Sequence, residues 1–252
     1  LLPPGRERDV SPWRLGVPAL DLRLGLAGLS VPAVHELKPV SVGPVAGARA
    51  AALGFLLRLA AGRIAGLAAQ GRMPRILVSA PAAALHEMGR LYGPGLAALG
   101  LDPRAFLLVE TAREAEALWA VEEGLRSGSV ALAVGILGHV ALTPARRLSL
   151  AAEEYRTPCL LLTGSKTPAA GATATRWRIA PAPSAPQAFD PNAPGSPRYR
   201  VSLERCRMGP PAPESPMLVE WLERGFRPVL DGPEIDGRPD RNVRRLSTGA
   251  AA

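Results

Sequence analysis

The sequence has 252 residues, of which 47% are hydrophobic and only 4% aromatic, so alanine, leucine and valine must fill a full-sized core. Basic residues outnumber acidic ones by 30 to 22, a net charge of +8 that permits contact with nucleic acid or an acidic partner without requiring it. Cys159 and Cys206 lack metal-binding spacing, and no uninterrupted apolar run reaches the roughly 18 residues of a membrane helix. With no cleavable signal pattern at its start, the chain is expected to be soluble and cytoplasmic, with no membrane contact.

Strands and helices alternate through the first two thirds of the chain, after a polar, proline-rich stretch at residues 1–18 that we interpret as a flexible arm. Apolar periodicity predicts strands at 33–37, 75–79, 105–109, 129–134 and 159–163. It predicts helices at 46–69, 82–99 (interrupted near Gly93–Pro94), 113–126 and 144–155. This alternation is typical of βαβ units, so we expect an α/β fold with a parallel sheet covered on both faces.

The pattern changes after Thr163. Residues 174–180, 198–205 and 217–222 alternate as strands do, which predicts an antiparallel edge added to the parallel sheet. From residue 223 onward the chain has few large apolar residues, so we expect disorder there. The predicted organisation is therefore an arm at 1–18, one domain at 19–222 and a tail at 223–252.

A degenerate phosphate-binding loop stands between the first strand and the first long helix. Against the pattern G-x-x-x-x-G-K-[ST], the chain keeps Gly43 but has Ala48, Arg49 and Ala50 in place of the second glycine, the lysine and the hydroxyl. Ala50 offers no oxygen to Mg²⁺. Two interpretations remain open. Gly43, Gly47 and Arg49 form a remnant that still attracts phosphate, or the glycines make a turn and Arg49 is a solvated charge, which we favour.

Several segments together resemble the RecA ATPase core, and among RecA-like proteins the ImuA family, which is associated with SOS mutagenesis in bacteria. The resemblance covers about residues 15–222 and rests on the order and spacing of loose motifs. Those motifs are Leu20-Asp21-x-x-Leu24-Gly25-x-x-Gly28-Leu29, Val34-His35-Glu36-Leu37, Leu91-Tyr92-Gly93-Pro94-Gly95-Leu96, Glu114-Ala115-Glu116-Ala117-Leu118, Arg146-Arg147-Leu148, Arg176-Trp177-Arg178 and Leu218-Val219-Glu220-Trp221. It implies a RecA-like three-layer fold, with a mainly parallel central sheet flanked by helices.

Set beside RecA-like ATPases, the chain lacks the groups that carry phosphoryl transfer. The strand resembling Walker B, at 130–137, ends without a carboxylate, and the position of the catalytic glutamate falls around 79–82, with no acid before Glu87. We therefore expect no enzyme activity, no cofactor and no metal. His35, His86 and His139 have no mutual metal spacing.

The tryptophans are expected in packing roles. Trp119 is predicted to be in the core or half-buried, and Trp177 and Trp221 are predicted to pack the edge sheet rather than stack on bases. Arginine groups, among them Arg146/Arg147, Arg176/Arg178 and Arg198/Arg200, could contact DNA or an acidic protein, although such groups usually mark solvated faces.

By the resemblance, the chain is expected to be a non-catalytic accessory protein of error-prone translesion synthesis. The implied partners are an ImuB-like Y-family protein, RecA and an error-prone replicative-type polymerase, with nucleoid association when induced. The alternatives are a SulA-like cell-division inhibitor, a weak ATP-binding RecA paralogue that uses Arg49, and simple DNA binding through the basic surface.

Overall fold

The computed structural model describes residues 13–25, 28–40, 45–166, 171–187, 189–190, 193–207, 209 and 216–229. Its helices are α1 (Pro18–Arg23), α2 (Val45–Ala68), α3 (Ala82–Met88), α4 (Gly93–Ala98), the short 3₁₀ helix η1 (Pro103–Ala105), α5 (Glu114–Ser127) and α6 (Leu142–Glu154). Its strands are β1 (Val34–Pro39), β2 (Ile76–Pro81), β3 (Phe106–Thr111), β4 (Leu132–Ile136), β5 (Cys159–Leu162), β6 (Thr175–Ala182), β7 (Arg198–Cys206), β8 (Met217–Leu222) and β9 (Gly225–Pro228).

The nine strands of the described residues form one mixed sheet in the order β3-β2-β4-β5-β1-β6-β7-β8-β9. The pairings from β3 across to β6 are parallel, and those from β6 to β9 are antiparallel. The predicted α/β class is thereby confirmed, as is a parallel sheet extended by antiparallel strands from the C-terminal third. This layout is consistent with a RecA-like fold.

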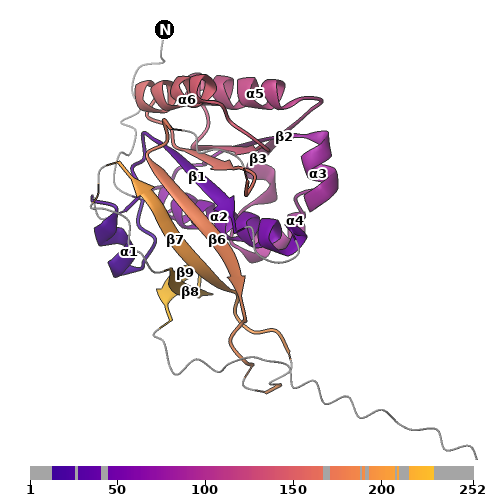
Figure 1. Cartoon of the computed structure of the whole chain (residues 1–252), viewed down its shortest axis with the longest axis vertical. Coiled ribbons are helices and arrows are strands. Elements are labelled where there is room, and N and C mark those ends of the chain that lie inside the picture. The colour runs from indigo at the N-terminus through magenta and orange to yellow at the C-terminus, as the bar shows by residue number, and fades with distance from the viewer. Residues whose placement is uncertain are drawn as a thin grey trace, which may run out of the picture.

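Helices cover both faces of the sheet and make three layers (Figure 1). On one face α2 buries Phe55 and Leu56 against a large cluster that includes Leu37 and Trp177. On the other, α5 and α6 pack onto a smaller cluster, whose members include Val121, Leu125, Leu148, Cys159 and Leu161. β1 lies near the middle of the sheet, and neighbouring residues on it point to opposite faces. It therefore contributes to both layers.

α2 is the main helix of the larger layer. It is long and apolar enough to cross a membrane by length and composition, over Gly47–Ala68, with half of that window buried inside the fold. Leu56, Leu59 and Leu67 are each at most 2% exposed. In this structure the apolar side of α2 is thus covered by the sheet.

The predicted helix at 82–99 is two helices, and the break precedes the predicted place. α3 ends at Met88, where Gly89 adopts a φ of +82° that other residues rarely adopt. α4 then begins at Gly93, with Pro94 in its first turn. Proline is favoured there because the first-turn N–H groups have no partner within the helix. Gly93–Pro94 therefore starts a helix instead of interrupting one.

The flexible arm predicted at 1–18 is wrong for its last residues, while residues 1–12 lie outside the described part of the chain. Trp13, Leu15 and Val17 are at most 5% exposed, and Trp13 exchanges two backbone hydrogen bonds with Leu29. The carboxylate of Asp21 accepts hydrogen bonds from the N–H groups of the intervening chain, at 2.8 Å from Leu15 and 3.1 Å from Gly16. Three apolar side chains at alternate positions bury this segment despite its polar neighbours.

The domain also continues past residue 222, where the tail was predicted to begin. β9 pairs antiparallel with β8, and Phe226 is 3% exposed between Phe55 and Trp221, with ring centroids 4.7 and 4.9 Å away. Phe226 is the one buried apolar residue of this four-residue strand. A single apolar residue gives no periodic pattern, so the sequence did not predict β9. Residues 230–252 lie outside the described residues.

Candidate functional site

The candidate site lies at the carboxyl ends of the parallel strands, where β1 leads into α2. Ligands of open α/β sheets bind outside these strand ends. Residues 41–44 lie outside the described part of the chain, and with them Gly43 of the predicted phosphate loop. Gly47 is exposed in the first turns of α2, and a Cβ built there would meet nothing within 4 Å. An alanine at position 47 would therefore not clash with any of the described residues.

Arg49, at the lysine position of the loop pattern, is held by a carboxylate. Its Nη1 lies 2.6 Å from Oε2 of Glu87, with side-chain exposures of 13% for Arg49 and 48% for Glu87. The charge is thus ion-paired and mostly buried, not the solvated charge that the sequence suggested. The Nε of Arg49 is buried without a hydrogen-bond partner among the described residues.

α3 directly follows β2, and the ion pair places Glu87, near the end of α3, against Arg49 in the first turns of α2. In the sequence, Glu87 lies several residues beyond the position of the catalytic glutamate, so its spacing did not indicate a role at the phosphate loop. That position, 79–82, holds no carboxylate. Ser79 is fully buried and donates a hydrogen bond of 3.3 Å to the carbonyl of Val109. The first acid after β2 therefore contacts the residue at the lysine position.

The end of β4, which resembles the Walker B strand, receives a carboxylate from another element. All five residues of β4 are buried, and none is acidic. Glu114, the first residue of α5, accepts hydrogen bonds from the backbone N–H groups of Gly138 and His139. A Cβ built at Gly138 would clash with Glu114 Oε1. Sequence reasoning missed this contact because Glu114 precedes β4 by a whole helix.

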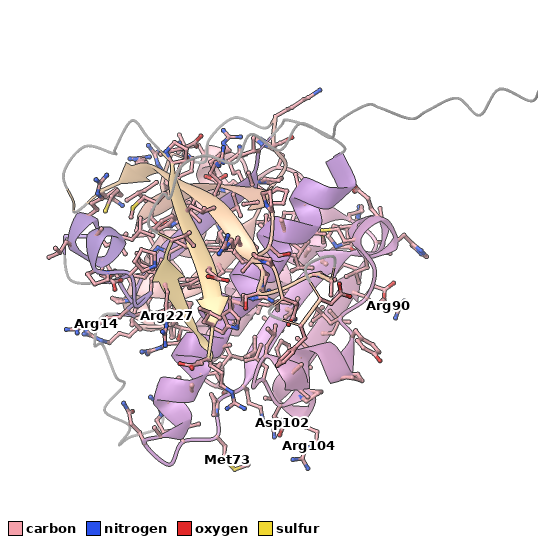
Figure 2. The ribbon with its side chains drawn as sticks, turned by 90° about the horizontal axis from the view of Figure 1, so that it is seen from below. Arg14, Met73, Arg90, Asp102, Arg104 and Arg227 are labelled. Carbon is pink, nitrogen blue, oxygen red and sulfur yellow. The ribbon has the colours of Figure 1, made fainter. Side chains whose placement is uncertain are left out.

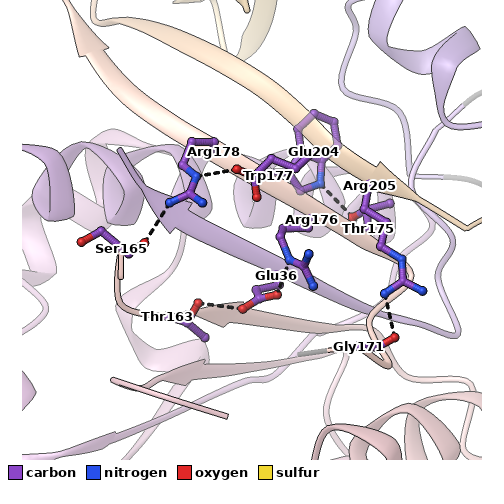
Figure 3. A network of polar contacts seen from close by, with 10 residues as sticks. All are labelled: Glu36, Thr163, Ser165, Gly171, Thr175, Arg176, Trp177, Arg178, Glu204 and Arg205. Atoms are coloured by element: carbon purple, nitrogen blue, oxygen red, sulfur yellow. Dashed lines mark hydrogen bonds and ion pairs between the residues drawn. The ribbon is translucent and has the colours of Figure 1, made fainter. Parts of the chain in front are cut away.

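A network of charged and polar side chains links β1, β6 and β7 with the chain just after β5 (Figure 3). Glu36 on β1 is 1% exposed; its Oε2 lies 2.9 Å from Arg176 Nε, and its Oε1 accepts a 2.9 Å hydrogen bond from Thr163. Arg178 pairs with Glu204 at 2.7 Å and donates to the carbonyl of Ser165. Both arginines of the Arg-Trp-Arg motif are therefore engaged within the fold.

His35 belongs to a second, neutral network. Its Nε2 donates to the carbonyl of Ser30 at 2.8 Å, because a carbonyl can only accept, and its Nδ1 then accepts from the hydroxyl of Thr175 at 2.8 Å. The same hydroxyl accepts from Trp177 Nε1 at 2.8 Å. Burial lowers the pKa of His35 to about 4, opposed by the Ser30 hydrogen bond. His35 is a neutral structural residue.

The other candidate residues do not gather into a metal site. His86 and His139 are exposed. Within the described ranges, no group of three or more His, Cys, Asp or Glu side chains could hold a metal ion. Cys159 is fully buried, and burial raises its pKa.

The structure confirms two of the three tryptophan predictions. Trp177 is 1% exposed in the core, and Trp221 packs edge-on against Phe226. Trp119 is 62% exposed, so its prediction was wrong. The buried face of α5 contains Ala117, Val121 and Leu125. Trp119 lies two residues from the first two of these, on the opposite side of the helix.

These observations define a three-layer α/β protein with a RecA-like layout, in which the position of the phosphate-loop lysine holds an ion-paired arginine. No family model matches the chain. Two curated relatives are both called Protein ImuA, from Caulobacter vibrioides strains NA1000 / CB15N and CB 15; each is 40% identical over 131 residues, which cover 48% of this chain and 53% of the relative. The match thus spans about half the length of these relatives. It supports membership of the ImuA family.

Proposed function

We propose that the protein is a non-catalytic RecA-like accessory factor of the SOS response, acting through protein contacts in error-prone translesion synthesis. The likeness to ImuA supports an SOS mutagenesis-associated family. The proposed partners are an ImuB-like Y-family protein, RecA and an error-prone replicative-type polymerase in the cytoplasm.

The observation that carries the non-catalytic part is the ion pair between Arg49 and Glu87 beside Ala50. A phosphate loop needs a free cation for the β/γ-phosphates and a hydroxyl for Mg²⁺. Here the cation already has a carboxylate partner, and Ala50 supplies no oxygen. Glu114, whose carboxylate lies just beyond the end of β4, accepts hydrogen bonds from the backbone N–H groups of Gly138 and His139. These features favour a scaffold over an ATPase.

The test is direct binding of the purified full chain to RecA and to an ImuB-like protein, alone and together. Binding to at least one is expected to persist without nucleotide and to be unchanged in the Arg49→Ala variant. Absence of binding to both proteins would overturn the proposal. ATP turnover above background that disappears in Arg49→Ala would overturn its non-catalytic part.

One observation favours a second candidate, weak nucleotide binding. The buried Nε of Arg49 has no hydrogen-bond partner among the described residues and lies near the start of α2, where helix N–H groups attract anions. Calorimetric titration with ATP and Mg²⁺ distinguishes the candidates. Weak nucleotide binding predicts a heat of binding that is lost in Arg49→Ala and enhanced in Glu87→Gln, because the second variant frees the guanidinium. The non-catalytic accessory factor predicts no heat of binding.

A further inference from the structure

A pocket of about 230 Å³ opens between the middle of α2, the segment at 13–16 and the β8–β9 hairpin. Its lining includes the aromatic residues Trp13, Trp221 and Phe226 and the cations Arg14, Arg58 and Arg224. It shares no residue with the candidate site described above. Figure 2 shows the Arg14 side chain pointing away from the ribbon.

The guanidinium of Arg58 is fixed in place before any ligand arrives. Its central carbon lies 5.6 Å from the centre of the Tyr199 ring and 5.8 Å from that of Trp221, and its Nη1 donates to the carbonyl of Gly54 at 3.0 Å. Contacts with two aromatic rings hold an arginine in one orientation. A ligand group that pairs with it therefore loses little affinity to ordering the side chain.

The positive charge of the pocket is not neutralised from within. No Asp or Glu lines it, and none of its three arginines forms an ion pair within the part of the chain that the structure describes. Many other arginines of the fold are paired, including Arg49, Arg176 and Arg178. Burial lowers the pKa of Arg58, opposed by Tyr199. The pocket is thus complementary to an anion with an apolar part.

The size of the pocket distinguishes between two kinds of anionic ligand, a small molecule such as a nucleotide and an acidic segment of a protein. Sites for nucleotides and other small molecules usually enclose about 300–1,000 Å³. At about 230 Å³, this one suits a single bulky side chain. Tryptophan and arginine are also the residues most enriched at the energetic centres of protein interfaces.

We propose that this pocket docks a short acidic segment of a partner protein. One bulky apolar side chain of the segment enters between Trp13, Trp221 and Phe226, and flanking Asp or Glu carboxylates pair with the three arginines. Guanidinium groups suit this because they bind carboxylates in a planar, two-bonded geometry. The site does not depend on the function proposed above, since it requires only a partner of this chemistry.

The test titrates the full chain with a capped hexapeptide that carries one phenylalanine between Asp and Glu residues, followed by tryptophan fluorescence, because Trp13 and Trp221 line the pocket. Replacing the phenylalanine of the peptide by alanine is expected to weaken binding at least tenfold. The double variant Arg14→Gln/Arg224→Gln is expected to do the same without unfolding, since both residues are exposed.

The matched control is Arg146→Gln/Arg200→Gln, which removes two exposed charges from other elements and should leave affinity within twofold. Arg58→Gln, checked for folding by circular dichroism, is a further variant that should weaken binding. The proposal is overturned if no peptide binds, if the control weakens binding as much as the test variant, or if a single-stranded oligonucleotide binds more tightly with the same dependence on Arg14 and Arg224. Self-association of the full chain that is abolished in the test variant would also overturn it, because a second copy would then be the occupant.

Discussion

Arg49 at the start of α2 and Glu87 near the end of α3 form a 2.6 Å ion pair between the helix that begins at the degenerate phosphate loop and the helix that follows β2. In a working loop the position of Arg49 serves phosphate, and here it serves an internal carboxylate. The pair connects the helix after β1 to the helix after β2, so it contributes to the positions of both.

The strength of this pair can be measured by a double-mutant cycle with Arg49→Met and Glu87→Gln. Because Glu87 is about half exposed, solvent screens the interaction, and we expect a coupling energy of about 0.5–1 kcal/mol in urea unfolding. The exposed pair Arg104–Asp102 is the control, and its coupling should be near zero. Equal coupling in both cycles would contradict a structural role for Arg49.

Breaking the buried pair of Glu36 and Arg176 should lower the stability of the fold far more than breaking the Arg49–Glu87 pair. Arg176→Met removes the arginine that pairs with the carboxylate of Glu36, which is 1% exposed and keeps its hydrogen bond from Thr163; the loss is expected to cost about 3–5 kcal/mol. Arg227→Met breaks an exposed pair with Glu223 and should cost less than about 1 kcal/mol. Chemical denaturation of both variants checks the difference, and similar losses would contradict the assigned burial.

Thr175 serves two buried groups with one hydroxyl, so its removal should cost more than one hydrogen bond. Thr175→Val keeps the shape but leaves Trp177 Nε1 and His35 Nδ1 without their partner, at an expected cost of about 2–4 kcal/mol. Thr143→Val, at an exposed position, is the control and should be neutral. The measurement is the urea midpoint at pH 7.5, where an unchanged value for Thr175→Val would refute the network.

His35 makes stability depend on pH in a defined direction. Its pKa falls from 6.5 to about 4 on folding, because burial disfavours the charged ring. The unfolded chain therefore binds the proton first, and stability is lost as pH falls from about 6.5 toward 4, by about 3 kcal/mol in all. Urea titrations between pH 7.5 and 4 should show this slope reduced in His35→Gln relative to His86→Gln, which alters an exposed histidine.

The strand β9 should prove part of the domain. Phe226→Ala removes a ring that contacts Phe55 and Trp221, with an expected loss of about 3–5 kcal/mol. Arg227→Ala, the next residue along, is exposed and should change stability by less than about 1 kcal/mol. Thermal and urea unfolding of the two variants give the comparison. A neutral Phe226→Ala would mean that the domain ends at β8.

Periodicity was enough to predict the α/β class, because each strand from β1 to β8 has its own apolar run. It failed for Trp13, Leu15 and Phe226, whose burial depends on contacts with distant parts of the chain. The candidate site was predicted as a set of replacements at Arg49 and Ala50. The partners Glu87 and Glu114 could not be predicted, since each acts across a helix and no local spacing indicates it.

The place of β1 in the sheet has a consequence for biosynthesis. β1 pairs with β5 at Cys159–Leu162 and with β6 at Thr175–Ile179, more than 120 residues later. A ribosome adds about 5–20 residues per second, so β5 and β6 are synthesised several seconds or more after β1 and α2. During that time the apolar side of α2 lacks β5 and β6, two of the strands that cover it in the finished fold. The half-made chain, rather than the finished protein, is therefore the form most exposed to aggregation and most in need of chaperones.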